Sequence, residues 1–106
     1  MVTLSLFLQV DCREEHRSDR EGFAAWVHEL REAFTPKGLL LSAAVSPSKR
    51  VIDYAYDVPS IARDLDWIGV MTYDYHGHWD KKTGHVAPLY HHPEAEFDYF
   101  NSVRKK

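Results

Sequence analysis

The chain has 106 residues, which is enough for one small domain and too few for two, because single domains commonly contain about 100 to 200 residues. Hydrophobic residues make up 44% of the chain and aromatic residues 13%, so we expect a globular segment with a core, not a disordered one. The formal net charge of -3, from 13 basic and 16 acidic residues, gives no field that would concentrate nucleic acid or anionic lipid, so neither is expected as a partner.

The cysteine content and the start of the chain carry little signal. The single cysteine, Cys12, cannot form an intramolecular disulfide, which taken alone suits a reducing compartment. Residues 1–8 are apolar but lack a basic leader and a small-residue cleavage site, and the run is far too short to span a bilayer. The sequence therefore predicts neither a targeting signal nor a membrane association.

The first half of the chain predicts a strand and then a long helix. Residues 2–10 form an apolar run rich in β-formers, which favours a buried strand, although a helix is also possible. The charged residues 11–17 predict a surface loop. Ser18 and Glu21 have the capping-box spacing, and an amphipathic helix is predicted over residues 19–34. Its apolar positions recur at one-face helical intervals: Phe23, Trp26, Val27, Leu30 and Phe34.

Two further elements follow the turn at Pro36 and Gly38, where proline blocks the helix and glycine permits a tight turn. Residues 39–45 are nearly all apolar and predict a strand covered on both faces, although the leucines also permit a helix. A second helix is predicted from about Asp57, and it is short. Its markers are a proline in the first turn and two apolar residues one turn apart: Pro59, Ile61 and Leu65.

Residues 67–73 are apolar, β-branched and aromatic, and predict another buried strand. The order helix, strand, helix, strand indicates βαβ units with parallel strands and right-handed crossovers. Residues 74–92 mix polar and aromatic side chains without periodicity, which is typical of a long functional loop. The predicted fold class is therefore α/β.

Candidate binding residues gather at the end of the 67–73 strand. Ligands of parallel α/β layers bind at the carboxyl ends of strands, so Met71, Tyr73 and Asp74 are the first candidates. A tyrosine hydroxyl beside a carboxylate can hold a polar substrate group, whereas the simpler interpretation is a strand-end tyrosine and a turn-forming aspartate. The loop 75–79 adds aromatic faces suited to stacking on sugar rings, with core packing of Trp79 as the competing interpretation.

Histidines raise the question of a metal site. Imidazole is a common zinc ligand, and the loop after the last strand holds most of the seven histidines of the chain. They are His76, His78, His85, His91 and His92. No recognised ligand spacing completes a site and the lone cysteine is distant in sequence, so no metal and no cofactor is expected.

A family resemblance appears once these segments are read together. Residues 71–80 (MTYDYHGHWD) followed by 82–90 (KTGHVAPLY) resemble the sixth barrel strand and following loop of glycoside hydrolase family 18 chitinases, notably animal ones. Residues 39–46 (LLLSAAVS) are similar to the fifth strand of that family, and residues 19–34 to the helix before it. Residues 8–12 (LQVDC) look like the segment just after the family's catalytic strand.

The resemblance covers about residues 9–99 and implies one partial domain, residues 1–106, without a second domain. It implies a fragment of a (β/α)8 TIM barrel around the fifth and sixth strands, with parallel strands and flanking helices. A complete barrel needs about 250 residues and eight strands, so we expect this chain not to close. Open strand edges and uncovered apolar faces would then favour aggregation, self-association or partial disorder.

The implied chemistry is substrate-assisted hydrolysis of β-1,4-linked N-acetylglucosamine, in which the substrate's own acetamido oxygen attacks the anomeric carbon. At the matching positions, Tyr73 would hydrogen-bond the acetamido carbonyl and Asp74 would contact the sugar around the cleavage point. Met71 and Ala43 would shape the acetamido pocket, and Trp79 would stack on the sugar at the leaving-group side. The implied partner is chitin or a chitooligosaccharide.

One departure from the family pattern bears on activity. The family's general acid is the glutamate that ends an Asp-x-x-Asp-x-Asp-x-Glu strand, expected immediately before Leu8, yet residues 1–7 read MVTLSLF. Glu14, Glu15 and Glu21 lie beyond that position and are not credible replacements. Without a proton donor to the leaving oxygen a major catalytic contribution is lost, so we expect negligible chitinase turnover.

Three functional hypotheses remain at this point. The first is a chitinase-like segment that is catalytically inactive alone, and the second is a non-catalytic chitin-binding or lectin-like module that uses Tyr73, Asp74 and Trp79. The third, less favoured, is a histidine-rich metal-binding domain. The family is typically extracellular, so the resemblance implies an extracellular protein. It also implies that the disulfide partner of Cys12 lies outside this piece.

Overall fold

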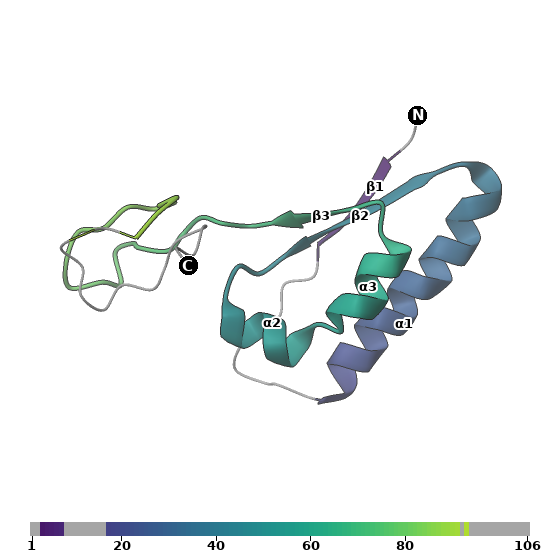
Figure 1. Ribbon diagram of the computed structural model, residues 1–106, viewed down its shortest axis with the longest axis horizontal. Helices are drawn as coiled ribbons and strands as arrows, with labels where there is room; N and C mark the ends of the chain where they lie inside the picture. The colour runs from purple at the N-terminus through teal and green to yellow at the C-terminus, as the bar shows by residue number, and fades with distance from the viewer. Residues whose placement is uncertain (1–2, 8–16, 92, 94–106) are drawn as a thin grey trace. The chain divides into compact units, whose positions relative to one another are not determined.

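The computed structural model describes residues 3–7, 17–91 and 93, and it divides into two compact units, residues 1–71 and 72–106 (Figure 1). The first unit contains the regular elements: β1 (Thr3–Phe7), α1 (Arg17–Phe34), the 3-10 turn η1 (Thr35–Lys37), β2 (Leu40–Val45), α2 (Lys49–Ala55), α3 (Val58–Asp64) and β3 (Trp67–Val70). Residues 72–91 and 93 of the second unit form loops and turns, as the lack of periodicity predicted.

The described strands of the first unit form a parallel sheet in the order β1-β2-β3. The register places Phe7 beside Ala44 and Val45 beside Val70, so β2 is hydrogen-bonded on both sides. Helix α1 connects β1 to β2, and α2 and α3 connect β2 to β3 (Figure 1). The predicted βαβ arrangement with parallel strands is confirmed, and β1 confirms a strand within residues 2–10.

Helix α1 confirms the prediction of an amphipathic helix over residues 19–34, with a different start. It begins at Arg17, so Ser18 lies in the first turn and not at the N-cap that the capping-box spacing indicated. The helix runs into the 3-10 turn η1 and stops at Gly38, which has the left-handed φ of 63° and donates its N–H to the carbonyl of Thr35 (3.2 Å). Proline and glycine thus end the helix where expected.

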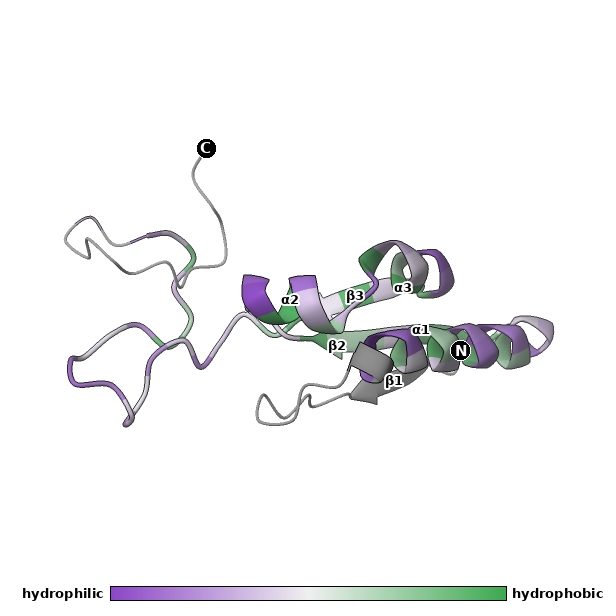
Figure 2. Ribbon diagram, turned by 90° about the horizontal axis from the view of Figure 1, so that it is seen from below, coloured by the Kyte–Doolittle hydropathy of each residue, from purple (hydrophilic) through white to green (hydrophobic). Residues whose placement is uncertain are grey.

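The core lies between the helices and one face of β2, and Figure 2 shows hydrophobic residues in green along these elements. Its buried members are Phe23, Val27, Leu41, Ala43, Val45, Tyr56, Ile61 and Leu65. Burying a side chain of valine or leucine size stabilises the fold by about 1.5–3 kcal/mol, so this cluster dominates the stability of the unit. Trp26 departs from the prediction, because it lies on the flank of the α1 stripe and is 44% exposed.

Helix α3 confirms the second predicted helix. Asp57 is its N-cap: its carboxylate accepts bonds from the backbone N–H (3.4 Å) and the hydroxyl (2.8 Å) of Ser60, and Pro59 lies in the first turn. Ile61 and Leu65 are buried, as their spacing predicted. Helix α2 was not predicted. Ala55 is buried and Val51 and Ile52 pack partly buried against the core, but seven residues are too few to show a helical period in the sequence.

Strand β3 is shorter and more exposed than the sequence predicted. The prediction was a buried strand over residues 67–73, but β3 ends at Val70, with Trp67 47% and Val70 49% exposed. Within the described sheet, β3 is an edge strand with β2 as its neighbour. Its side chains are therefore partly exposed although its composition is apolar.

A polar clamp joins the elements at the amino ends of β2 and β3. The Arg31 guanidinium of α1 donates to the Asp66 carboxylate (2.9 Å) and to the carbonyl of Leu39 (2.9 Å), and the same Asp66 oxygen accepts the backbone N–H of Leu41 (2.7 Å). The bond from Leu41 and the neighbouring Arg31 lower the pKa of Asp66 against a smaller opposing effect of burial. Of the described residues, no helix is long and apolar enough to cross a membrane.

Candidate functional site

Alternation along β2 decides which side chains can face a ligand. Successive strand residues point to opposite faces of a sheet, and Leu41, Ala43 and Val45 pack in the core against the helices. Ala43 is 2% exposed there, so its side chain has no surface to offer a sugar. Ala44 is half-buried and lies on the other face, which we call the second face of the sheet. Of the two alanines, Ala44 and not the predicted Ala43 therefore lies on the face opposite the core.

Met71 extends the second face at the end of β3. Its N–H donates to the carbonyl of Val45 (3.0 Å), so the ladder continues one residue beyond the strand. Gly69 pairs with Ala44, and by alternation Met71 points to the same side as Gly69. Ala44, Gly69 and Met71 therefore share the second face at the carboxyl ends of their strands, whereas Ala43 lies on the helix face.

Tyr73 and Asp74 open the loop of the second unit. Tyr73 is 49% exposed, so about half of this residue is open to solvent. Asp74 has φ of 55°, in the left-handed region that side chains other than glycine and asparagine or aspartate rarely adopt. Residues held in such regions cluster at functional sites, which supports a role for this position beyond an ordinary turn.

The loop that follows is held by its own backbone and by one carboxylate. The N–H of Tyr75 donates to the carbonyl of Val86 (2.9 Å) and closes the loop at its base. The Asp80 carboxylate accepts the N–H of Gly77 (3.0 Å) and lies 3.3 Å from Nδ1 of His76, while the N–H of Asp80 donates back to the Gly77 carbonyl (3.0 Å). The loop therefore has a defined local conformation without regular secondary structure.

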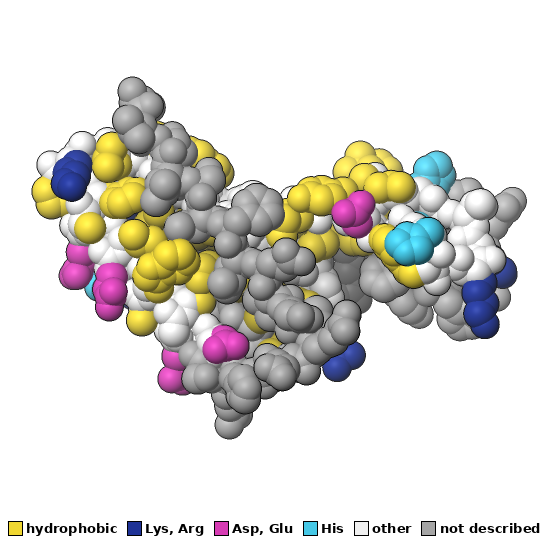
Figure 3. Space-filling model, turned by 180° about the vertical axis from the view of Figure 1, so that it is seen from behind, with side chains coloured by type: hydrophobic (Ala, Val, Ile, Leu, Met, Phe, Trp, Pro, Cys, Tyr) yellow, Lys and Arg dark blue, Asp and Glu magenta, His cyan; other side chains and the backbone are white. Residues whose placement is uncertain are grey.

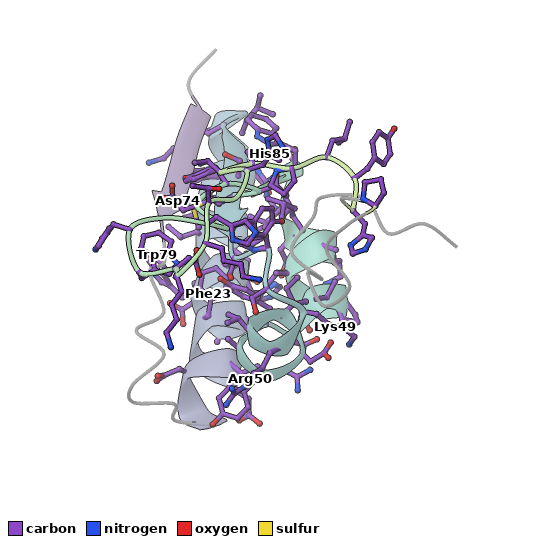
Figure 4. All side chains as sticks on the ribbon, turned by 90° about the vertical axis from the view of Figure 1, so that its left-hand side faces the viewer. Phe23, Lys49, Arg50, Asp74, Trp79 and His85 are labelled. Atoms are coloured by element: carbon purple, nitrogen blue, oxygen red, sulfur yellow. The ribbon has the colours of Figure 1, made fainter. Side chains whose placement is uncertain are left out.

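Trp79 lies on this loop (Figure 4), and the residue is 58% exposed. The competing interpretation, core packing of Trp79, is contradicted by this exposure. The His78 ring meets the indole edge-on, with centroids 5.2 Å apart and planes at 73°. On the 72–91 segment, Figure 3 shows hydrophobic and histidine side chains together on one visible face. An exposed indole can stack on the apolar side of a sugar ring.

The shifted carboxylic acids belong to the first unit and serve the fold. Burial of Asp64 would raise the pKa of its carboxyl, but bonds from Arg63 and from His28 (Nδ1 to Oδ2, 3.0 Å) hold that pKa below its ordinary value. Hydrogen bonds from Ser60 likewise lower the pKa of Asp57. Among the described residues, no group of three or more His, Cys, Asp or Glu side chains is arranged to hold a metal ion. His92, Cys12, Glu14 and Glu15 lie outside the described residues.

The comparison with known families decides the assignment. The family described as Glycosyl hydrolases family 18 matches residues 4–105, nearly the whole chain. The chain belongs to glycosyl hydrolases family 18. This confirms the family resemblance drawn from the strand-end motif, and the parallel strands with flanking helices are the corresponding part of its TIM barrel.

Individual members of the family match closely over short lengths. "Probable chitinase 10" of Drosophila melanogaster is 62% identical over 93 residues, which are 88% of this chain and 4% of that protein. Catalytic domain 2 of the Ostrinia furnacalis Group II chitinase superposes with a TM-score of 0.85 at 57% identity, covering 93% of this chain and 27% of that one. The chain thus spans a small part of the family 18 proteins it matches.

Two further solved structures contain or describe sugar ligands. A mutant of the same Ostrinia furnacalis domain was solved with penta-N-acetylchitooctaose; it superposes with a TM-score of 0.82 at 57% identity, covering 93% of this chain and 27% of that one. Human YKL-39, described as a pseudo-chitinase with retained chitooligosaccharide binding, superposes with a TM-score of 0.63 at 39% identity, covering 69% of this chain and 22% of that one. Family 18 members of this fold therefore include sugar-bound and non-catalytic proteins.

Sequence reasoning missed two residues of this region. Ala44 was passed over in favour of its neighbour, because residues 39–45 are nearly all apolar and their alternation does not show which set packs on the helices. Gly77 was not among the candidates, because no pattern in the sequence indicates the close approach of the Trp79 ring to it.

Proposed function

We propose that this family 18 segment binds chitooligosaccharides and by itself does not cleave them. The observation that carries the proposal is the Trp79 indole, exposed on an ordered loop that begins with Tyr73 and Asp74 just beyond the carboxyl end of a parallel strand. Carboxyl ends of barrel strands are where ligands of this fold bind. The sugar-bound relative at 57% identity supports the same ligand class for this chain.

Each residue has a role that suits its chemistry. The hydroxyl of Tyr73, a residue that is 49% exposed, donates a hydrogen bond to the acetamido carbonyl of N-acetylglucosamine, and the Asp74 carboxylate accepts from the amide or a hydroxyl of the sugar. Within the first unit, Ala44 shares the second face with its register partner Gly69, and Ala44 and Met71 offer apolar contacts that suit an acetamido methyl group. The Trp79 indole stacks on a neighbouring sugar ring.

The proposed lack of cleavage rests on the residues found where the family resemblance expects the proton donor. Substrate-assisted hydrolysis needs an acid at the glycosidic oxygen as well as groups that hold the acetamide. Residues 1–7 contain no aspartate or glutamate, and Glu21 is an exposed residue near the start of α1. Tyr73 and Asp74 then contribute affinity without a partner to protonate the leaving group.

Titration of the 106-residue chain with penta-N-acetylchitopentaose, followed by tryptophan fluorescence and calorimetry, tests the binding. We expect saturable binding that Trp79→Ala weakens roughly tenfold, the equivalent of about 1.4 kcal/mol. Trp26→Ala is the matched control, because Trp26 is also exposed (44%) but lies on α1. Binding that is absent, or that both variants weaken equally, would contradict the proposal.

Cleavage is tested separately by measuring new reducing ends after prolonged incubation with the same sugar. We expect the rate of the starting protein to equal that of Tyr73→Phe and of buffer. Hydrolysis that is lost in Tyr73→Phe would show that this chain carries a proton donor of its own.

The family resemblance also supports an extracellular location, which is part of the proposal. Expression of the natural gene in its own cells, with detection by an antibody in medium and in cell extract, tests it. Accumulation in the extract with none in the medium would contradict an extracellular role.

A further inference from the structure

Gly77 stands where any side chain would collide with the Trp79 indole. A Cβ built on Gly77 would lie 2.4, 2.5 and 2.8 Å from Cη2, Cζ3 and Cζ2 of Trp79. Distances under 3.0 Å between such carbon atoms are repulsive, so the benzene part of the indole occupies the space that an alanine methyl group would fill. The observed orientation of the Trp79 side chain therefore requires that residue 77, two positions earlier, has no side chain.

The backbone gives no other reason for glycine at this position. Of the described glycines, Gly38 is the one with a positive φ, so residue 77 has a conformation that L-amino acids adopt. Its N–H donates to the Asp80 carboxylate and its carbonyl accepts from the N–H of Asp80, and alanine could form both bonds. The steric requirement at residue 77 comes from the ring.

Hydrogen bonds within the same loop hold the backbone against which the indole packs. Asp80 holds Gly77 from one side, and the backbone bond from Tyr75 to Val86 closes the base of the loop. His78, the residue between them in sequence, forms a T-shaped pair with Trp79, with the ring planes at 73° to one another. The ring is thus located at Gly77 while 58% of the residue stays exposed.

We propose that Gly77 is a positioning residue for Trp79. Because residue 77 has no side chain, the indole can adopt the orientation seen in the structure, and in this orientation its exposed surface receives a sugar ring. The inference rests on the proposed function, because it assigns Gly77 to the orientation of the stacking residue in that same site. A ring that is oriented before the ligand arrives loses less rotational freedom on binding, which favours affinity.

A merely structural role for Gly77 predicts different behaviour. The atoms nearest to the built Cβ are the far end of the Trp79 side chain, so in Gly77→Ala the ring can turn away at little cost to the fold. The positioning role thus predicts lost affinity at unchanged stability. A structural role predicts lost stability, with affinity lost only through unfolding.

The test compares three variants of the 106-residue chain, Gly77→Ala, Trp79→Ala and Gly22→Ala, by thermal unfolding and by titration with penta-N-acetylchitopentaose. Gly22→Ala is the matched control, since a Cβ at this helical position meets nothing within 4 Å. We expect Gly77→Ala to weaken binding about three- to tenfold, Trp79→Ala at least as much, and Gly22→Ala not at all. The double variant Gly77→Ala with Trp79→Ala should bind as weakly as Trp79→Ala alone.

Nuclear magnetic resonance gives a readout without sugar. The α-protons of Gly77 should be shifted upfield by the indole ring current in the starting protein, and Trp79→Ala should abolish that shift. Absence of the shift, full affinity in Gly77→Ala, or additive losses in the double variant would each overturn the positioning role. No sugar binding by the starting protein, with the ring-current shift present, would overturn the proposed function and the assignment of Gly77 to it.

Discussion

Substituting valine for each of two adjacent alanines separates the core from the proposed pocket. Ala43 is 2% exposed and packed among the core residues of β2 and the helices, so two extra methyl groups there have no free volume. Overpacking of a filled core costs about 1–3 kcal/mol. Ala44 is half-buried on the second face, where a β-branched side chain suits a strand, and we expect a stability change within about 0.5 kcal/mol.

Sugar affinity should respond in the opposite order. Ala44→Val narrows the space beside Met71 and should weaken penta-N-acetylchitopentaose roughly tenfold, while Ala43→Val should leave the affinity of the folded fraction unchanged. Urea unfolding followed by circular dichroism measures the first effect, and calorimetric titration measures the second. Greater destabilisation by Ala44→Val than by Ala43→Val would refute the assignment of the two faces.

Two other predictions concern aspartates. Asp74 has φ of 55°, so the Asp74→Gly variant should be more stable than the Asp74→Ala variant by about 1 kcal/mol in thermal unfolding. Both variants should lose sugar affinity. Equal stabilities of the two variants would contradict backbone strain at this residue. The pKa values of Asp57, Asp64 and Asp66 lie below the ordinary 3.8 in the folded chain, so their stabilising contribution is present above pH 3.8 and is lost as the pH falls through the folded values. Urea midpoints should therefore fall on acidification below about pH 4, and a flat profile would argue against these bonds.

Local patterns in the sequence predicted the elements that local chemistry determines. Helix α1 follows from the spacing of its buried residues, and its end follows from Pro36 and the left-handed Gly38. Helix α3 follows from an N-cap aspartate and a first-turn proline, and the parallel arrangement follows from the alternation of helix and strand. These features depend on residues within a few positions of one another.

Features that depend on tertiary neighbours were not accessible in the same way. Trp26, Trp67 and Val70 have core composition but lie at a helix flank and at a sheet edge, and their exposure depends on what packs beside them. The motif around Tyr73 and Asp74 pointed to the candidate site, since it is carried by residue identity. The left-handed Asp74 and the contact of Trp79 with Gly77 became visible only in three dimensions.

The strand order β1-β2-β3 repeats the order of the chain, and this has a consequence for how the segment folds. Each strand joins the one synthesised just before it, and α1 packs against β2, α2 and α3 soon after they exist. Contacts between neighbours in sequence close short loops and form early, and synthesis from the amino end delivers them in that order. The sheet can thus grow one βα unit at a time on the ribosome, with β3 as the growing edge.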